Sequence, residues 1–191
     1  MVIDAMAAAG YDYATCHVPG FGFATGERDA LSTVSLNEGA VIKDWESFDR
    51  YVWPDPSSAG FSILKQAAHY LPEGMKLMVM GPGGVLENVI GLVGYENLCY
   101  LIYDEPELVQ AVFDQVGSRM VQYYEGAASI STVGFLSSND DWGFNRRPSS
   151  VPRICANTYS PGTKRSWRRR IATASPACCT PVAALTRLLT T

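Results

Sequence analysis

The sequence predicts an α/β protein with a parallel sheet. Three short apolar runs, at 11–16, 76–80 and 133–136, have the length and composition of strands. Longer stretches between them repeat apolar residues at helical spacing. Strands that alternate with helices in this way are joined by crossovers and run parallel. A doubly wound sheet and part of a barrel both fit this order.

Charge divides the chain into two parts. Its 191 residues are 47% hydrophobic and 18% charged, which is typical of a globular protein. Residues 1–145 hold all 19 acidic and six basic residues, a net charge of −13, whereas 146–191 hold nine basic and no acidic residues, +9. We therefore expect a folded part at 1–145, followed by an irregular, disordered basic tail rich in Pro, Arg, Ser and Thr.

No targeting or membrane segment is expected. No apolar run reaches the roughly 18 residues of a membrane span. The apolar segment 1–10 lacks a positive charge and carries Asp4, so it is not a signal peptide. The five cysteines have no spacing that predicts a disulfide framework or a zinc site. We expect a cytoplasmic protein.

The first half of the chain predicts three helices around the first strand. The sequence begins inside the helix predicted at 1–9, so we expect that a segment upstream is missing. A short helix is predicted at 44–52. Another is predicted at 57–71, with Ser57 or Ser58 as its N-cap.

The second half predicts three more helices. Gly81-Pro-Gly-Gly84 follows the second strand and opens a helix at 85–92. A second helix is predicted at 95–103. The third, at 104–126, has Pro106 near its first position and acidic residues in its first turn.

Polar residues follow the last strand, Val133 to Leu136, which we expect to be buried. They are Ser137, Ser138, Asn139, Asp140 and Asp141. Since chemistry in parallel α/β proteins lies at the carboxyl ends of strands, Asp140 and Asp141 could bind or polarise a substrate. Either could act as a general acid or base if burial raised its pKa. A solvated turn is the alternative, and which Asp points inward stays open because neighbours on a strand alternate faces.

Two other strand ends carry weaker candidates. Gly83 and Gly84 could present backbone N–H groups to a carboxylate, although a plain strand-to-helix turn needs the same glycines. Glu87 could equally interact with the helix dipole. His17 and Cys16 end the first strand and face the same edge, where simple packing is the alternative to a metal site or a nucleophile.

Seven segments resemble, in order, the uroporphyrinogen decarboxylase superfamily. They are Gly10-Tyr-Asp-Tyr13, Trp53-Pro-Asp-Pro56, Leu71-Pro-Glu-Gly-Met75, Gly83-Gly-Val-Leu-Glu87, Gly94-Tyr-Glu-Asn-Leu98, Asp104-Glu-Pro-Glu-Leu108 and Asp140-Asp-Trp-Gly143. The resemblance covers 1–145 and implies a partial (β/α)8 TIM barrel, with about three of the eight strands. The Arg-rich segment that true decarboxylases carry on their first strand is not found before Gly10.

The resemblance implies one of two activities. One is cofactor-free decarboxylation of the acetate groups of uroporphyrinogen, and the other is zinc-assisted methyl transfer between corrinoids and thiols. In either case the partner is a small molecule: a porphyrinogen, or a methylated corrinoid and a thiol. The predicted site has Asp140 and Asp141 as catalytic residues, and His17, Gly83, Gly84 and Asn139 as substrate-binding residues. A family label would be uroporphyrinogen decarboxylase, but we expect this fragment to be inactive.

The tail is compatible with another reading frame of the same family. With suitable codons, Tyr159–Trp167 read one nucleotide earlier gives Ile-Phe-Pro-Trp-His-Lys-Lys-Ile-Val. Residues 177–183 likewise give Leu-Leu-His-Ser-Cys-Gly. Both resemble segments that family members carry there, and the second resembles the zinc ligands of the methyltransferase branch. We therefore favour a methyltransferase as the full-length parent, for which zinc and a corrinoid are possible, and we expect no cofactor in this chain.

A native basic tail is the alternative to a frame change near Asn145. Four arginines surround Trp167 between 165 and 170, a composition that suits phosphate contacts with aromatic stacking. Nucleic-acid binding is the third and least favoured function. A solvated charge run would have the same composition.

Overall fold

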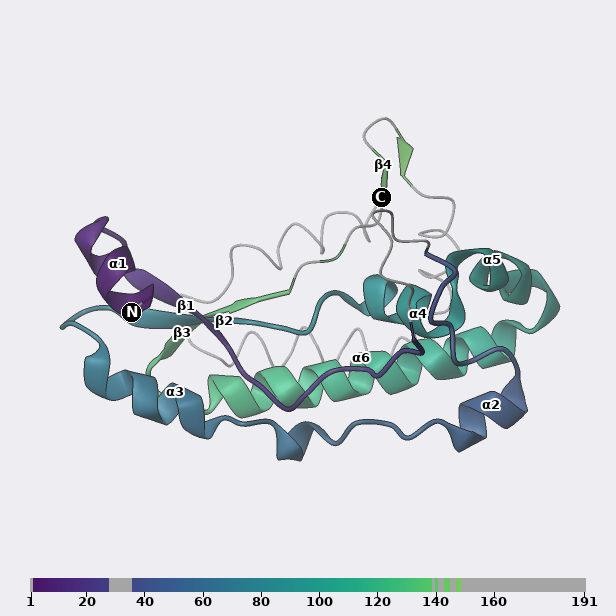
Figure 1. Cartoon of the computed structure of the whole chain (residues 1–191), viewed down its shortest axis with the longest axis horizontal. Helices are drawn as coiled ribbons and strands as arrows, with labels where there is room; N and C mark the ends of the chain where they lie inside the picture. The colour runs from purple at the N-terminus through teal and green to yellow at the C-terminus, as the bar shows by residue number, and fades with distance from the viewer. Residues whose placement is uncertain (1, 28–35, 139, 141–142, 145–146, 149–191) are drawn as a thin grey trace.

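The described part of the chain is an α/β fold built on a three-stranded parallel sheet. The computed structural model describes residues 2–27, 36–138, 140, 143–144 and 147–148. The strands of the sheet are β1 (Tyr13–His17), β2 (Lys76–Met80) and β3 (Val133–Ser137), and a two-stranded antiparallel pair follows, β4 (Gly143–Phe144) and β5 (Arg147–Pro148). The helices are α1 (Val2–Ala8), α2 (Trp45–Arg50), η1 (Pro56–Ser58), α3 (Ser62–Ala67), η2 (Ala68–Tyr70), α4 (Val85–Val93), α5 (Tyr95–Asp104) and α6 (Pro106–Ala128) (Figure 1).

The sheet has the order β1-β2-β3, so each strand lies beside the next one along the chain. His17, Met80 and Ser137 stand in one row, and the carboxyl ends of the three strands therefore meet at one edge. The register shifts between Leu77 and Met78, opposite Gly134. A Cβ on Gly134 would lie 2.7 Å from Cβ of Lys76, so glycine lets the two strands approach there.

The two faces of the sheet differ in burial. Ala14, Leu77 and Val79 are 0%, 1% and 0% exposed and belong to the core. Met78 of β2 and Phe135 of β3 lie in one row on the opposite face and are half-buried. This alternation follows from the two-residue period of a strand. The expectation that 133–136 is a buried strand is wrong in its burial, because every residue of β3 keeps part of its surface exposed.

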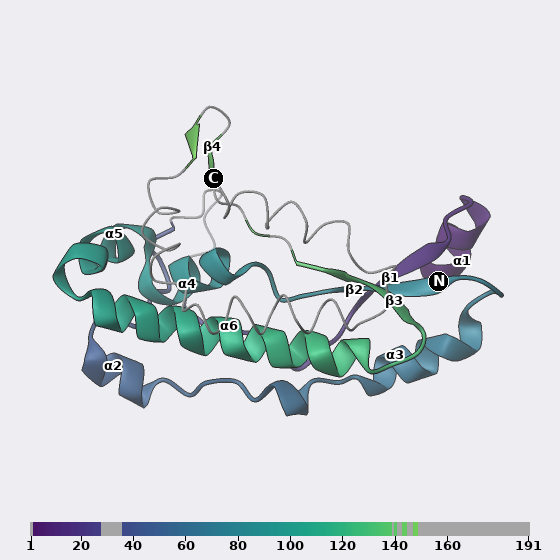
Figure 2. The same cartoon turned by 180° about the vertical axis from the view of Figure 1, so that it is seen from behind.

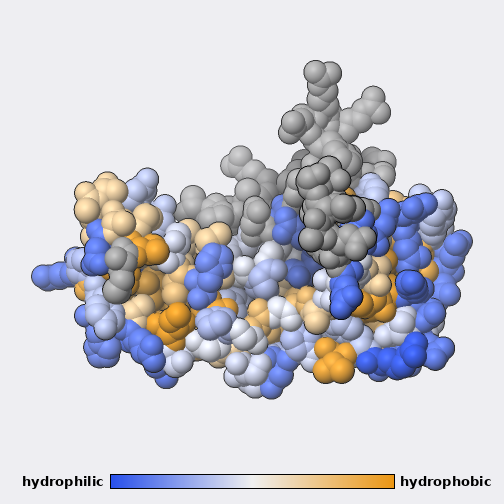
Figure 3. Space-filling view, in the orientation of Figure 1, coloured by the Kyte–Doolittle hydropathy of each residue, from blue (hydrophilic) through white to orange (hydrophobic). Residues whose placement is uncertain are grey.

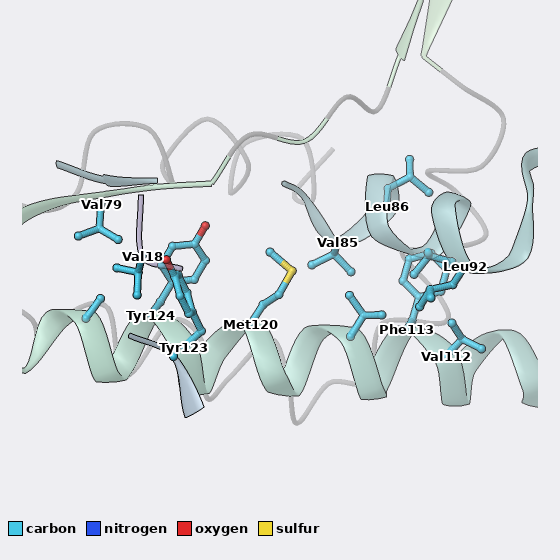
Figure 4. Close-up of a cluster of buried hydrophobic side chains, with 14 of the residues drawn as sticks. Val18, Val79, Val85, Leu86, Leu92, Val112, Phe113, Met120, Tyr123 and Tyr124 are labelled. Carbon is cyan, nitrogen blue, oxygen red and sulfur yellow. The ribbon is translucent and has the colours of Figure 1, made fainter. Parts of the chain in front are cut away.

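Helix α6 fills the space beneath the buried face. It starts at Pro106, whose missing N–H is not needed at a first helical position. Figure 4 shows Met120, Tyr123 and Tyr124 rising from α6 toward the strands, where Val79 points down. Nearer the start of α6, Phe113 packs among residues of α4.

The segment from α2 to α3 runs along the other side of α6 (Figures 1 and 2). Arg119 of α6 lies 5.2 Å from the ring centre of Trp53 and donates from Nε to the Pro54 carbonyl at 3.1 Å. The ring of Phe61 packs against Gly126, where a Cβ would come within 2.7 Å of it. These contacts attach the extended chain to α6, so α6 is covered on both sides.

The predicted helix 57–71 is wrong at its start. Asp55, not Ser57 or Ser58, accepts the capping hydrogen bond, from the Ser57 N–H at 2.9 Å, and only a 3-10 turn follows. The Gly60 N–H then donates to the Pro19 carbonyl at 2.8 Å. That tertiary contact takes the backbone out of the helix, and α3 begins at Ser62.

The other predicted elements are confirmed, with ends within a few residues. The clearest example is β2, which has the predicted bounds, and α2 begins after its predicted first residue, Asp44, which caps it. No single helix among the described residues is long and apolar enough to span a membrane. Helices α4 and α5 pass such a test only as a pair, and they bend by 92° where they meet.

The surface is mixed. Figure 3 shows apolar residues gathered at the end of the molecule that carries α1, where Val2 is 59% exposed. Other exposed large side chains include Val52 and Tyr103. Exposed residues of this kind are ordinary for a protein surface.

Candidate functional site

Polar groups and glycines gather at the carboxyl edge, by which we mean the end of the sheet formed by His17, Gly81–Gly84, Ser137, Ser138 and Asp140. The row of His17, Met80 and Ser137 brings the three predicted strand ends together. The prediction that they share one edge is therefore confirmed. Their roles as substrate-binding or catalytic groups stay predictions.

The glycine loop after β2 is held firmly against the first turn of α4. Gly83 has a φ of +94°, which a side chain would strain, and Gly84 is the N-cap. The Gly84 N–H donates to Oε2 of Glu87 at 3.0 Å. Asn88 donates from Nδ2 to the carbonyls of Pro82 and Gly84, at 3.0 and 2.7 Å. The loop thus opens the helix as predicted, and Glu87 serves as a first-turn cap.

The carboxylate of Asp140 accepts hydrogen bonds from backbone N–H groups in the first turn of α4. Its Oδ2 accepts from the Leu86 N–H at 3.0 Å, and its Oδ1 from the Glu87 N–H at 3.2 Å. A Cβ on Gly84 would lie 2.1 Å from Cγ of Asp140, so only glycine leaves room for this approach. Two predicted site residues, Gly84 and Asp140, are therefore in direct contact.

Tyr124, which the sequence interpretation missed, holds the end of β3. Its hydroxyl donates to the Ser137 carbonyl at 3.0 Å, and the Gly81 N–H donates to the same oxygen at 3.0 Å. A Cβ on Gly81 would lie 1.8 Å from that hydroxyl. Burial raises the pKa of Tyr124; a hydrogen bond with Ser138 lowers it, and the charge of Asp140 raises it.

Tyr123 holds the end of β2 in the same way, through a hydrogen bond from its hydroxyl. Its hydroxyl donates to the Met80 carbonyl at 3.2 Å, and its ring stacks on Phe21 with a centroid distance of 5.0 Å. Burial, with smaller contributions from Tyr124 and Cys16, raises its pKa to about 12. Tyr124 continues the helical spacing of the apolar residues along α6, and a pair of adjacent tyrosines near a helix end was the available signal.

Cys16 and His17 do not form one site. They are adjacent on β1, so their side chains point to opposite faces of the sheet. Cys16 packs against the core and burial raises the pKa of its thiol, whereas His17 is exposed. His17 therefore remains a candidate on the open side of the carboxyl edge without Cys16.

Several predicted residues lie outside the described part. These are Asn139, Asp141 and the tail beyond 148, with Cys155, Cys178 and Cys179. Among the residues that the structure describes, no three His, Cys, Asp or Glu side chains lie close enough together to hold a metal ion.

The fold and the edge define the class of protein: an α/β chain with polar groups at the carboxyl ends of parallel strands. Comparison with known proteins takes the identification no further, since no family model, curated protein or solved structure matches the chain.

Proposed function

We propose that residues 1–145 are part of a (β/α)8 barrel of the uroporphyrinogen decarboxylase superfamily, and that the carboxyl edge is part of its active site. The structural observation that supports the barrel is the sequential, parallel order β1-β2-β3 with all three carboxyl ends at one edge. In a barrel of this kind each strand pairs with the next, and catalytic residues lie at that edge.

The position of the helices supports the same reading. Successive crossovers of one hand that move in one direction across a sheet leave their helices on one face. Figures 1 and 2 both show α3 and α6 on the same side of the sheet. A doubly wound sheet can contain such a run of three strands, so the choice of family depends on the seven motifs, from Gly10-Tyr-Asp-Tyr13 to Asp140-Asp-Trp-Gly143.

The proposed chemistry is decarboxylation of a porphyrinogen without a cofactor. Substrate would lie over the carboxyl edge, near His17 and the Gly83–Gly84 loop, with Asn139, Asp140 and Asp141 supplied by the chain after β3. A barrel site draws residues from many strands, and the described sheet supplies three. We therefore expect residues 1–191 alone to be inactive.

Methyl transfer from a corrinoid is the second candidate, and it is the chemistry that we favour for the full-length parent because of the His-Ser-Cys-Gly segment in the shifted frame of 177–183. Such an enzyme would use zinc to activate a thiol. The described residues do not fit a zinc ion, because no three potential ligands lie together among them. This alternative therefore concerns a product of the other frame and not the present chain.

The decisive experiment starts from the DNA on both sides of codon 145. Sequencing should reveal a one-nucleotide frame change, and the continuous frame would then be expressed. Chromatography of porphyrin products tests decarboxylation, and the absorbance of methylcobalamin tests methyl transfer. Uroporphyrinogen turnover supports the first candidate and cobalamin demethylation the second. Neither activity in the continuous product would overturn the proposal, and an intact frame ending at residue 191 would contradict the frame change.

A further inference from the structure

Helix α4 is capped by a residue that is distant in sequence. Asp140 lies 54 positions after Leu86 and 53 after Glu87, the two residues whose N–H groups its carboxylate accepts. Helix α2 shows the usual local arrangement: Asp44 directly precedes it and accepts from the Ser47 N–H at 2.8 Å. The N-cap position of α4 is instead Gly84, which has no side chain to offer.

Gly84 and Asp140 are complementary in shape. At Gly84, φ is −91° and ψ is 171°, a conformation that any residue adopts, so the backbone does not require glycine. The nearest atoms to a Cβ there are Cγ, Cβ and Oδ1 of Asp140, at 2.1 to 2.2 Å. The small residue at 84 is thus explained by the carboxylate that lies against it.

The chain after β3 is fixed on a second side as well. The Ser137 carbonyl accepts hydrogen bonds from the Gly81 N–H and the Tyr124 hydroxyl, both at 3.0 Å. Ser137 and Asp140 therefore hold the chain at two points, the first against Gly81 and α6 and the second against the first turn of α4. A helix N-terminus stabilises negative charge, which favours the Asp140 carboxylate in this position even beside Glu87.

We propose that Asp140 is a positioning residue of the carboxyl edge: it latches the chain after β3 to the N-terminus of α4. Its carboxylate sets the geometry of the Gly81–Gly84 loop relative to the end of β3, because both of its oxygens accept from α4. This positioning role replaces the catalytic role that the sequence predicts for Asp140, and it leaves Asp141 as the candidate that would react with substrate. What the edge binds rests on the function proposed above, whereas the latch rests on the contacts of Asp140 and Gly84 alone.

The test is amide hydrogen exchange in the full chain, read at the Leu86 and Glu87 N–H groups. Asp140→Gly removes the carboxylate, and exchange at both amides should rise roughly tenfold, as for a lost helix cap. Gly84→Ala keeps the carboxylate but displaces it, and should give the same change. The double variant should exchange no faster than either single one, because both break the same contact. Asp140→Asn retains one acceptor oxygen in place of two and should keep one of the two amides, Leu86 or Glu87, protected.

Asp44→Gly is the matched control. It removes a local cap of the same chemistry and should raise exchange at Ser47 while leaving Leu86 and Glu87 unchanged. Unchanged exchange in Gly84→Ala, or effects that multiply in the double variant, would overturn the latch. The measurement uses no enzymatic activity, so the latch can fail while the proposed family stands, and the reverse.

Discussion

The two faces of the three-stranded sheet have different neighbours. On one face, Ala14, Leu77 and Val79 are fully buried against the core that α6 completes. On the other, Tyr13, Met78 and Phe135 are only half-buried. Yet Leu77–Met80 is apolar on both faces, a pattern typical of parallel strands that are covered on both sides. The sequence of β2 therefore suits a second covering layer, which the interior of the proposed barrel would supply.

The largest effect should come from truncating the buried face. Leu77→Ala removes a side chain that is 1% exposed and leaves a cavity, so it should lower the free energy of unfolding by about 2–5 kcal/mol. Met78→Ala, its neighbour on the opposite face, should cost less than half as much, because its side chain is already partly exposed. Urea unfolding of both variants measures this. Equal losses would mean that the two faces are packed alike.

A smaller effect is expected where the buried layer reaches the carboxyl edge. Gly81→Ala places a methyl group 1.8 Å from the Tyr124 hydroxyl and should cost about 1–3 kcal/mol through overpacking. Gly22→Ala is the control: a Cβ there meets nothing within 4 Å, and the loss should stay within about 0.5 kcal/mol. Thermal unfolding compares the two. A Gly81→Ala protein as stable as Gly22→Ala would show that Tyr124 is not packed against the loop.

The third prediction concerns pH. The pKa of Tyr123 is raised to about 12 in the folded chain, whereas a tyrosine in the unfolded chain ionises near pH 10. The unfolded chain therefore loses its proton first, and stability that is complete below pH 10 falls as the pH rises toward 12. Tyr123→Phe should make this fall shallower.

Below pH 10 the same variant should cost about 1 kcal/mol, because it loses the hydrogen bond to the Met80 carbonyl. Urea midpoints at pH 9 and pH 11 give both quantities. A residual fall is expected, since the pKa of Tyr124 is raised as well. An equal loss of stability between pH 9 and pH 11 in Tyr123→Phe and in the unsubstituted chain would contradict the raised pKa of Tyr123.

Local signals account for the parts of the fold that the sequence predicted. Strand β2 is an apolar run between Gly74 and Gly81, and both its bounds were predicted. Helix α6 combines a proline in its first turn with a long apolar stripe, so no neighbouring element was needed to predict it. The break before α3 was missed because it depends on the carbonyl of Pro19, which lies about 40 positions earlier in the chain.

The candidate site was predictable in its location but not in its internal contacts. The glycines before α4 indicated backbone N–H groups that can bind a carboxylate, and the acidic residues after β3 indicated side chains that can supply one. That Asp140 occupies the place beside Gly84 follows only from the pairing of β2 with β3. Tyr124 looked like an ordinary core position, since helical spacing shows that a side chain is buried but not which carbonyl its hydroxyl reaches.

The smallest effect tests how far the half-buried face is covered. The rings of Tyr13 and Phe135 come from β1 and β3 and meet at a centroid distance of 5.9 Å. A double-mutant cycle with Tyr13→Ala and Phe135→Ala should give a coupling below about 0.5 kcal/mol if water reaches this face. The matched pair on the covered side of the molecule, Phe21 and Tyr123, stacks at 5.0 Å and should couple by about 0.5–1.5 kcal/mol. If Tyr13 and Phe135 couple as strongly, water is excluded from the second face as well. The two faces of the sheet would then differ in which residues contact them but not in how far they are buried.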